Sequence, residues 1–153
     1  MSLEELDELY REVILDHYRN PRNNVKLADP DLSAVGYNPF CGDEVTITAK
    51  LDKDARIQAV GFRGQGCSIS QSSASMMTEL LKGHTIEEAE ALVAVFKQMM
   101  LGKEMEEAQR LELGELEALE GVRQYPIRIK CALLAWSALL DSIKEYRAAH
   151  RAS

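Results

Sequence analysis

Three cysteines and one aspartate are the residues of this chain whose types and positions could do chemistry together. Cys41 and Asp43 lie two residues apart, so a thiol and a carboxylate share one short turn. Cys67 follows a glycine-rich stretch just before an expected helix, where free amides and the helix dipole favour a thiolate over a thiol. Cys131 lies inside the last expected helix beside Lys130, a cation that also lowers the pKa of a thiol.

Together these four side chains would complete a tetrahedral site of three thiolates and one carboxylate, which suits zinc or iron with sulfide. The alternative is that the cysteines only fill the core, because there is no C-x-x-C pair and cysteine is commonly buried. Cys131 fits this alternative best because its neighbours are apolar, and Cys41 fits it worst because its turn is polar. The spacing of the cysteines alone leaves both interpretations open, although an odd number excludes a closed set of disulfides.

Other groups of residues are weaker candidates for a site. Gly61, Gly64 and Gly66 precede an expected helix, but their order and the lack of a following Lys-Ser/Thr do not match a phosphate-binding loop. The histidines are isolated in the sequence, and His17 is the one that we keep as a reserve ligand. The glutamates between residues 104 and 120 are expected to form a solvated face.

The composition restricts the class of protein and of partner. The 153 residues are 46% hydrophobic and 28% charged, which predicts one globular domain over residues 1–153 with its own core. A net charge of -7 and a pI near 5.0 disfavour nucleic acid and anionic membranes as partners and favour a protein or a metal ion. The acidic start does not resemble a signal peptide, and no apolar run is long enough to span a membrane. With free thiols, this predicts a cytoplasmic protein.

The elements that would position these residues begin with a helix and a sheet. The spacing of Ser2 and Glu5 indicates a capping box at the start of an amphipathic first helix. Alternation of apolar and polar residues predicts a strand over 43–51. A second strand is expected over 56–63, and a third over 32–38.

From residue 64 onward the pattern changes to helices. Ser70 is expected to cap a helix that ends at residue 81, and a second capping box predicts a helix over 86–100. A short helix and turns are expected over 103–121, and Pro126 fits the first turn of an apolar final helix. Strands followed by helices predict an α+β fold, a small antiparallel three-stranded sheet packed against about five helices.

Three motifs in this order resemble a known family over almost the whole chain. The sequence reads NPFCGD at 38–43, GQGCSIS at 64–70 and KCA at 130–132, with NPRN at 20–23. These segments resemble the IscU/NifU-type iron–sulfur cluster assembly proteins. The resemblance implies that a small antiparallel sheet packs on helices and that four metal ligands converge at one end of the fold. In this sequence the implied ligands are Cys41, Asp43, Cys67 and Cys131.

Departures from the IscU pattern point to the SufU branch of the family. IscU has a histidine immediately before the third cysteine, where this chain has Lys130, and the segment near 103–121 looks like an insertion relative to IscU. The Pro-Pro-Val-Lys motif that IscU presents to its chaperone is absent, since EGVRQYP occupies 120–126. The resemblance therefore favours a SUF-system protein over a chaperone-dependent scaffold.

The SufU-like features imply an accessory protein of sulfur transfer rather than a stand-alone enzyme. SufU-like proteins bind zinc through the four implied ligands and accept persulfide sulfur from a pyridoxal-phosphate-dependent cysteine desulfurase of the SufS type. A downstream SUF scaffold or an apo-protein would then receive the sulfur. Our hypothesis is that a desulfurase residue replaces Cys41 as a ligand, so that Cys41 becomes the sulfur acceptor.

Two alternatives use the same residues. In the first, the protein is a scaffold on which a transient iron–sulfur cluster is assembled and transferred to apo-proteins. In the second, it is a binding module whose zinc is purely structural. Lys130 and the insertion favour sulfur transfer over both alternatives.

Overall fold

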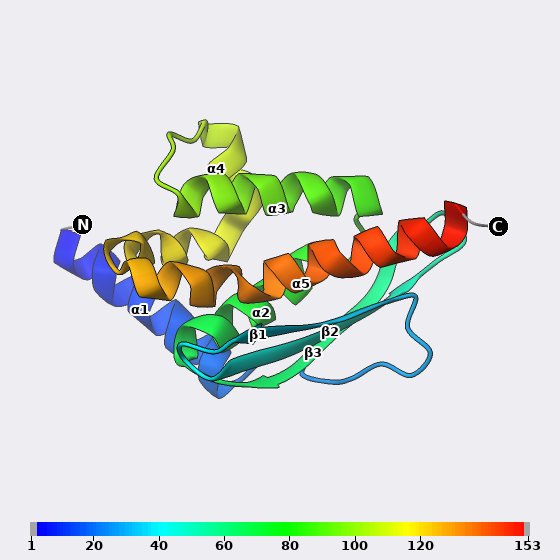
Figure 1. Ribbon diagram of the computed structural model, residues 1–153. Helices are drawn as coiled ribbons and strands as arrows, with labels where there is room; N and C mark the ends of the chain where they lie inside the picture. Colours follow the sequence, from blue (N-terminus) through cyan, green and yellow to red (C-terminus); the bar gives the residue numbers. More distant parts are fainter. Residues whose placement is uncertain (1–2, 152–153) are drawn as a thin grey trace.

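The computed structural model describes residues 3–151, and it confirms the predicted α+β fold with a three-stranded antiparallel sheet and five α-helices among those residues (Figure 1). Ser2 lies outside the described residues, so the first capping box stays a prediction. In chain order the elements are α1 Leu3–Arg19, β1 Leu32–Asn38, β2 Asp43–Leu51, β3 Ile57–Gln65, α2 Ser68–Leu81, α3 Ile86–Met100, α4 Glu107–Leu113, the 3-10 helix η1 Gly114–Gln124 and α5 Pro126–Arg151.

The sheet has the strand order β1-β2-β3, with β2 in the middle. The alternation that predicted β2 is confirmed, because Val45, Ile47 and Ala49 are fully buried on the face that packs on the helices. The last residue of β1, Asn38, pairs with the first residue of β2, Asp43. The two strands therefore close together at the turn that carries the first cysteine.

Helix α5 crosses the same face of the sheet along its length, as Figure 1 shows. The helix approaches β1 so closely that a Cβ on Gly36 would lie 3.1 Å from Leu134 Cδ1 and 3.2 Å from the Leu134 carbonyl oxygen. A side chain at position 36 would require the helix to shift by a few tenths of an ångström, so this position favours glycine. Within residues 3–151, no helix is both long enough and apolar enough to cross a membrane.

A hydrogen-bonded contact in the core fixes α2 against α5. The Trp136 indole nitrogen donates to Ser73 Oγ at 3.0 Å, and Ser73 Oγ donates to the Ala132 carbonyl at 2.6 Å. The Trp136 ring also stacks on Phe96 of α3, with ring centroids 4.5 Å apart. Cys67 directly precedes α2 and Cys131 belongs to α5, so this contact also fixes the two helices that position these cysteines.

The Glu-rich segment is packed onto the fold, so the expectation of a simple solvated face was incomplete. Leu113, Leu116 and Leu119 are buried at its inner side. Glu120 forms ion pairs with Arg110 at 2.8 Å and with Arg123 at 3.0 Å. The carboxylates of Glu120 and then Glu117 raise the pKa of the Arg110 guanidinium. Paired charges outside and leucines inside therefore hold α4 and η1 in place.

Candidate metal centre

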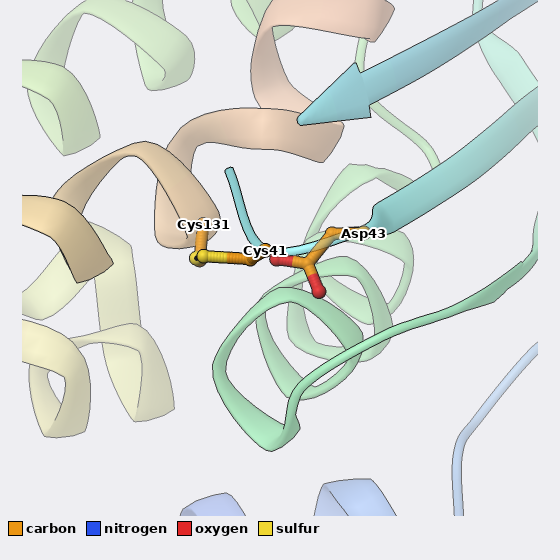
Figure 2. Close-up of side chains that lie close together, drawn as sticks. All are labelled: Cys41, Asp43 and Cys131. Atoms are coloured by element: carbon orange, nitrogen blue, oxygen red, sulfur yellow. Dashed lines mark hydrogen bonds between the residues drawn. The ribbon is translucent and has the colours of Figure 1, made fainter. Parts of the chain in front are cut away.

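Cys41, Asp43 and Cys131 meet at one end of the sheet, although the two cysteines are far apart in the chain (Figure 2). Their ligand atoms all lie within 4.8 Å of one another, and the sulfurs of Cys41 and Cys131 are 3.4 Å apart. Cys41 comes from the turn between β1 and β2, Asp43 from the start of β2 and Cys131 from the second turn of α5. Three of the four predicted ligands are therefore brought together.

Cys67, the fourth predicted ligand, lies beside this group of three. Its thiol donates to Asp43 Oδ2 at 3.5 Å, while its sulfur falls outside the set of mutually close ligand atoms. Cys67 is also the N-cap of α2, because its sulfur accepts the Ser70 N–H at 3.5 Å. The predicted N-cap, Ser70, was wrong: its hydroxyl instead donates to the Cys67 carbonyl at 3.1 Å, one turn into the helix.

The Asp43 carboxylate is fully buried and held by the loop before α2. Its Oδ1 accepts the Cys67 N–H at 2.8 Å. A Cβ on Gly66 would overlap this same oxygen, so the close approach of the loop requires glycine here. A buried carboxylate needs hydrogen bonds or a cation, and the described contacts leave Oδ2 facing the sulfur of Cys67.

The Cys131 thiol lies in an environment that disfavours its thiolate, and Arg128 provides a cation nearby. Burial, followed by hydrogen bonds with Asp43 and Cys41, raises the pKa of the Cys131 thiol. The pKa of the Arg128 guanidinium is raised by the negative charge of Cys67, then by a hydrogen bond with Cys131 and by the charge of Cys41. The site therefore favours either a protonated Cys131 or a bound cation that replaces its proton.

The donor set fits a zinc ion. Two thiolates that bind one zinc ion at about 2.3 Å in a tetrahedron lie about 3.8 Å apart, close to the 3.4 Å between Cys41 and Cys131. The Asp43 carboxylate lies close to this pair and the sulfur of Cys67 contacts that carboxylate, so Cys41, Asp43, Cys67 and Cys131 would supply four ligands. Thiolates favour zinc or iron over magnesium and calcium, which prefer oxygen.

His17, the reserve ligand, lies away from this group. Its Nδ1 is 2.8 Å from Ser75 Oγ, and its Nε2 is 2.8 Å from Glu115 Oε2. The side chain is buried between α1, α2 and η1, where it joins helices. The structure therefore gives His17 a packing role.

Sequence reasoning missed one residue at the site, Asn38. Its side-chain amide is 5% exposed, and its Nδ2 donates to Cys131 Sγ at 3.6 Å. The only sequence signal was its place at the start of the NPFCGD segment, three residues before Cys41. Lys130 also has a definite contact, since its Nζ lies 5.0 Å from the centroid of the Phe40 ring.

Comparison with known proteins agrees with this fold. Residues 9–153 match the family described as the NifU-like N terminal domain. The chain belongs to this family. The expected family and fold are thereby confirmed. In this chain Cys41, Asp43 and Cys131 lie together, and Cys67 contacts Asp43.

Named relatives cover most of the chain. The zinc-dependent sulfurtransferase SufU of Bacillus subtilis is 50% identical over 134 residues, which are 88% of this chain and 88% of the relative. The iron–sulfur cluster assembly scaffold protein IscU of Streptococcus pyogenes is 44% identical over 94% of this chain and 88% of its own. A crystal structure from Fervidobacterium islandicum, described as a candidate SUF-system scaffold protein, is 37% identical with a TM-score of 0.79, covering 86% and 93% of the two chains.

Proposed function

We propose that this protein accepts sulfur on Cys41 from a pyridoxal-phosphate-dependent cysteine desulfurase and passes it on for iron–sulfur cluster assembly in a SUF system. The proposal is supported by the 50% identity to a relative named as a zinc-dependent sulfurtransferase. The observation that carries it is the difference between the sulfurs: Cys41 lies partly exposed on a turn, whereas Cys131 is fully buried in α5.

The turn around Cys41 suits a sulfur that must meet another protein. Phe40 is 79% exposed beside it, so the turn projects from the fold. Gly42 has a φ of +68°, and a Cβ placed on it would touch nothing within 4 Å. The space around Gly42 leaves room for the Cys41 side chain to reorient, while Asn38 and the buried Asp43 hold the two ends of the turn. Cys41 can therefore leave the other ligands without disturbing the sheet.

Sulfur transfer to Cys41 needs no oxidant or reductant. The Cys41 thiolate attacks the outer sulfur of the desulfurase persulfide, a new S–S bond forms, and the S–S bond within the desulfurase breaks. The desulfurase cysteine leaves as a thiolate, and Cys41 becomes the persulfide.

The same four residues would hold a metal ion between transfers. Zinc bound to Cys41, Asp43, Cys67 and Cys131 would keep the sulfurs deprotonated at neutral pH without taking part in redox chemistry. Asp43 supplies the one oxygen ligand, and replacing it by alanine is expected to weaken zinc binding or to stabilise a bound iron–sulfur cluster. Unchanged metal retention in Asp43→Ala would count against this role.

A scaffold for cluster assembly is the second candidate, because the Streptococcus pyogenes relative carries that name and is 44% identical. Metal analysis of the purified protein separates the candidates. Zinc together with stimulation of a desulfurase supports sulfur transfer. Iron with sulfide and visible absorption supports a scaffold, and zinc without stimulation leaves only a structural metal.

Replacement of Cys41 tests the proposed acceptor directly. Cys41→Ala is expected to abolish stimulation of the desulfurase, because Cys131 is buried and Cys67, although also partly exposed, caps α2 with its sulfur. Ser137→Ala, an exposed position on α5, is the matched control and should stimulate like the unmodified protein. Turnover of the desulfurase with cysteine would be measured with each variant at equal concentration, and circular dichroism would check the fold. Undiminished stimulation by Cys41→Ala would exclude Cys41 as the acceptor.

A further inference from the structure

The three sulfurs differ in the N–H groups that donate to them, and Asn38 supplies the donor that distinguishes Cys131 from Cys41. We propose that Asn38 is a positioning residue of the metal centre: its amide fixes the sulfur of Cys131 as a permanent ligand and shapes the turn that leaves Cys41 as the reactive sulfur. The inference rests on the proposed sulfur transfer, since it explains why one of three thiols would be the acceptor.

Asn38 makes three hydrogen bonds from one buried position. Its Nδ2 donates to Cys131 Sγ at 3.6 Å, and its Oδ1 accepts the Phe40 N–H at 3.2 Å. Its backbone carbonyl accepts the Cys41 N–H at 3.3 Å. One residue therefore holds both the turn of Cys41 and the sulfur of Cys131.

The orientation of the Asn38 amide follows from these partners. The Phe40 N–H is a donor, so the atom that faces it must be the carbonyl oxygen of the side chain. The NH2 group must then face Cys131 Sγ, where the sulfur can only accept. The Asn38 backbone is also restrained, because Asn38 pairs with Asp43 across the sheet. A swap of the amide would lose both side-chain hydrogen bonds.

The sulfurs of Cys67 and Cys131 each accept an N–H group, whereas the sulfur of Cys41 accepts none from the described residues. Cys67 Sγ accepts the Ser70 N–H at 3.5 Å, and Cys131 Sγ accepts the Asn38 amide. Within residues 3–151, Cys41 Sγ has the sulfur of Cys131 as its hydrogen-bond partner and no N–H donor. The asymmetry is therefore built into the fold before any metal binds.

This difference in N–H donors separates the sulfurs that stay bound to the metal from the one that accepts sulfur. An N–H donor withdraws charge from the sulfur that accepts it. Groups that hydrogen-bond to a metal ligand also hold it in place, and their loss weakens metal binding by about 10–100-fold. Cys67 and Cys131 are held in this way, whereas the sulfur of Cys41 accepts no N–H group from the described residues. Cys41 therefore has the least restrained of the three sulfurs.

Two substitutions of Asn38 remove the donor in different ways. Asn38→Asp keeps an oxygen for the Phe40 N–H but has no NH2 group, and Asn38→Ala removes the side-chain contacts without adding charge. Ser137→Asp is the matched control, because it adds the same charge at an exposed position that lines the same shallow hollow beside Asn38. Circular dichroism of each variant would show that the fold is retained.

The measurement uses Co²⁺ in place of zinc, since its thiolate-to-metal absorption reports the charge on the sulfurs. Loss of the N–H from Cys131 is expected to shift this band to lower energy in both Asn38 variants, and zinc affinity in competition with a chelator should fall about 10–100-fold. Ser137→Asp should change neither quantity. An unshifted band, or a shift confined to Asn38→Asp, would overturn the proposal.

The test of Asn38 can fail or succeed independently of the test of sulfur transfer. The absorption band and the zinc affinity are measured without a desulfurase, so they test the role of Asn38 even if Cys41 accepts no sulfur. Conversely, failure of the unmodified zinc protein to stimulate a desulfurase would overturn the proposed function and leave the Asn38 hydrogen bonds intact.

Discussion

Asp43 is held in position by the chain itself, before any metal is bound. The Cys67 N–H donates to its Oδ1 at 2.8 Å, and Gly66 leaves the space that this oxygen occupies. The carboxylate is thereby aimed at the sulfur of Cys67 and at the pair formed by Cys41 and Cys131. Because this oxygen ligand is already held in place, metal binding loses less side-chain entropy.

A substitution at Gly66 should disrupt this arrangement. In Gly66→Ala the new Cβ meets the Asp43 carboxylate, so we expect weaker zinc retention and a loss of about 1–3 kcal/mol in the free energy of unfolding. Gly121→Ala is the matched control, because a Cβ there meets nothing within 4 Å. Denaturant unfolding and chelator competition would measure both variants. Equal zinc retention in the two would contradict the account of Asp43.

At the scale of residues, the sequence indicated which side chains are candidate ligands but not which side chains contact them. The three cysteines and Asp43 stood out because their chemistry and settings were visible in the sequence. The role of Asn38 was not, because a side-chain amide directed at a sulfur 93 positions later depends on how α5 lies on the sheet. The N-cap of α2 was placed at Ser70 because hydroxyls are the usual caps, whereas here a sulfur takes that place.

At the scale of elements, one buried histidine of α1 joins this helix to two others. His17 lies between Ser75 of α2 and Glu115 of η1, at 2.8 Å from each. Ser75 Oγ also accepts the Arg22 N–H at 2.9 Å, so the chain leaving α1 is held at the same point. The Glu-rich segment thus has a defined contact with the first helix, which composition alone could not reveal.

Removal of this histidine should loosen the helices without affecting the metal centre. His17→Ala removes a buried imidazole and its contacts with Ser75 and Glu115, so the free energy of unfolding should fall by about 1–3 kcal/mol. His84→Ala is the matched control, since His84 is partly exposed and pairs only at the surface with Glu88, and its effect should stay within about 0.5 kcal/mol. Zinc content should be unchanged in both. A loss of zinc from His17→Ala alone would contradict this separation of roles.

Elements with strong local signals were predicted well. The capping box of α3 is confirmed by reciprocal hydrogen bonds between Thr85 and Glu88, at 3.1 and 3.0 Å. Strands β1 and β2 also have the predicted limits. The contact of α1 with η1 could not be predicted, because it joins residues 98 positions apart through one polar side chain.

At the scale of the whole molecule, the candidate ligands tie together segments from most of the chain. The turn after β1, the start of β2, the residue before α2 and the second turn of α5 all contribute one group. Cys41 and Cys131 are 90 positions apart. A metal ion that binds these groups only in the folded state must therefore stabilise the fold as a unit.

Zinc should accordingly raise the thermal stability of the protein. At a free zinc concentration about a hundredfold above the dissociation constant, stabilisation of about 2.7 kcal/mol should raise Tm by about 5–10 °C. Magnesium should have no effect, because it prefers oxygen ligands. Calorimetry before and after treatment with a chelator would measure the change. Asp43→Ala should reduce it, and an equal zinc effect in that variant would contradict the assignment of Asp43 as a ligand.

The central claim is that sulfur from the desulfurase arrives on Cys41. It is tested most directly by incubating the zinc-loaded protein with a cysteine desulfurase and cysteine, trapping persulfides by alkylation and locating the added sulfur by peptide mass spectrometry. The account predicts one additional sulfur on the peptide that contains Cys41 and none on those that contain Cys67 or Cys131. Additional sulfur on Cys67 or Cys131, with Cys41 unmodified, would contradict it.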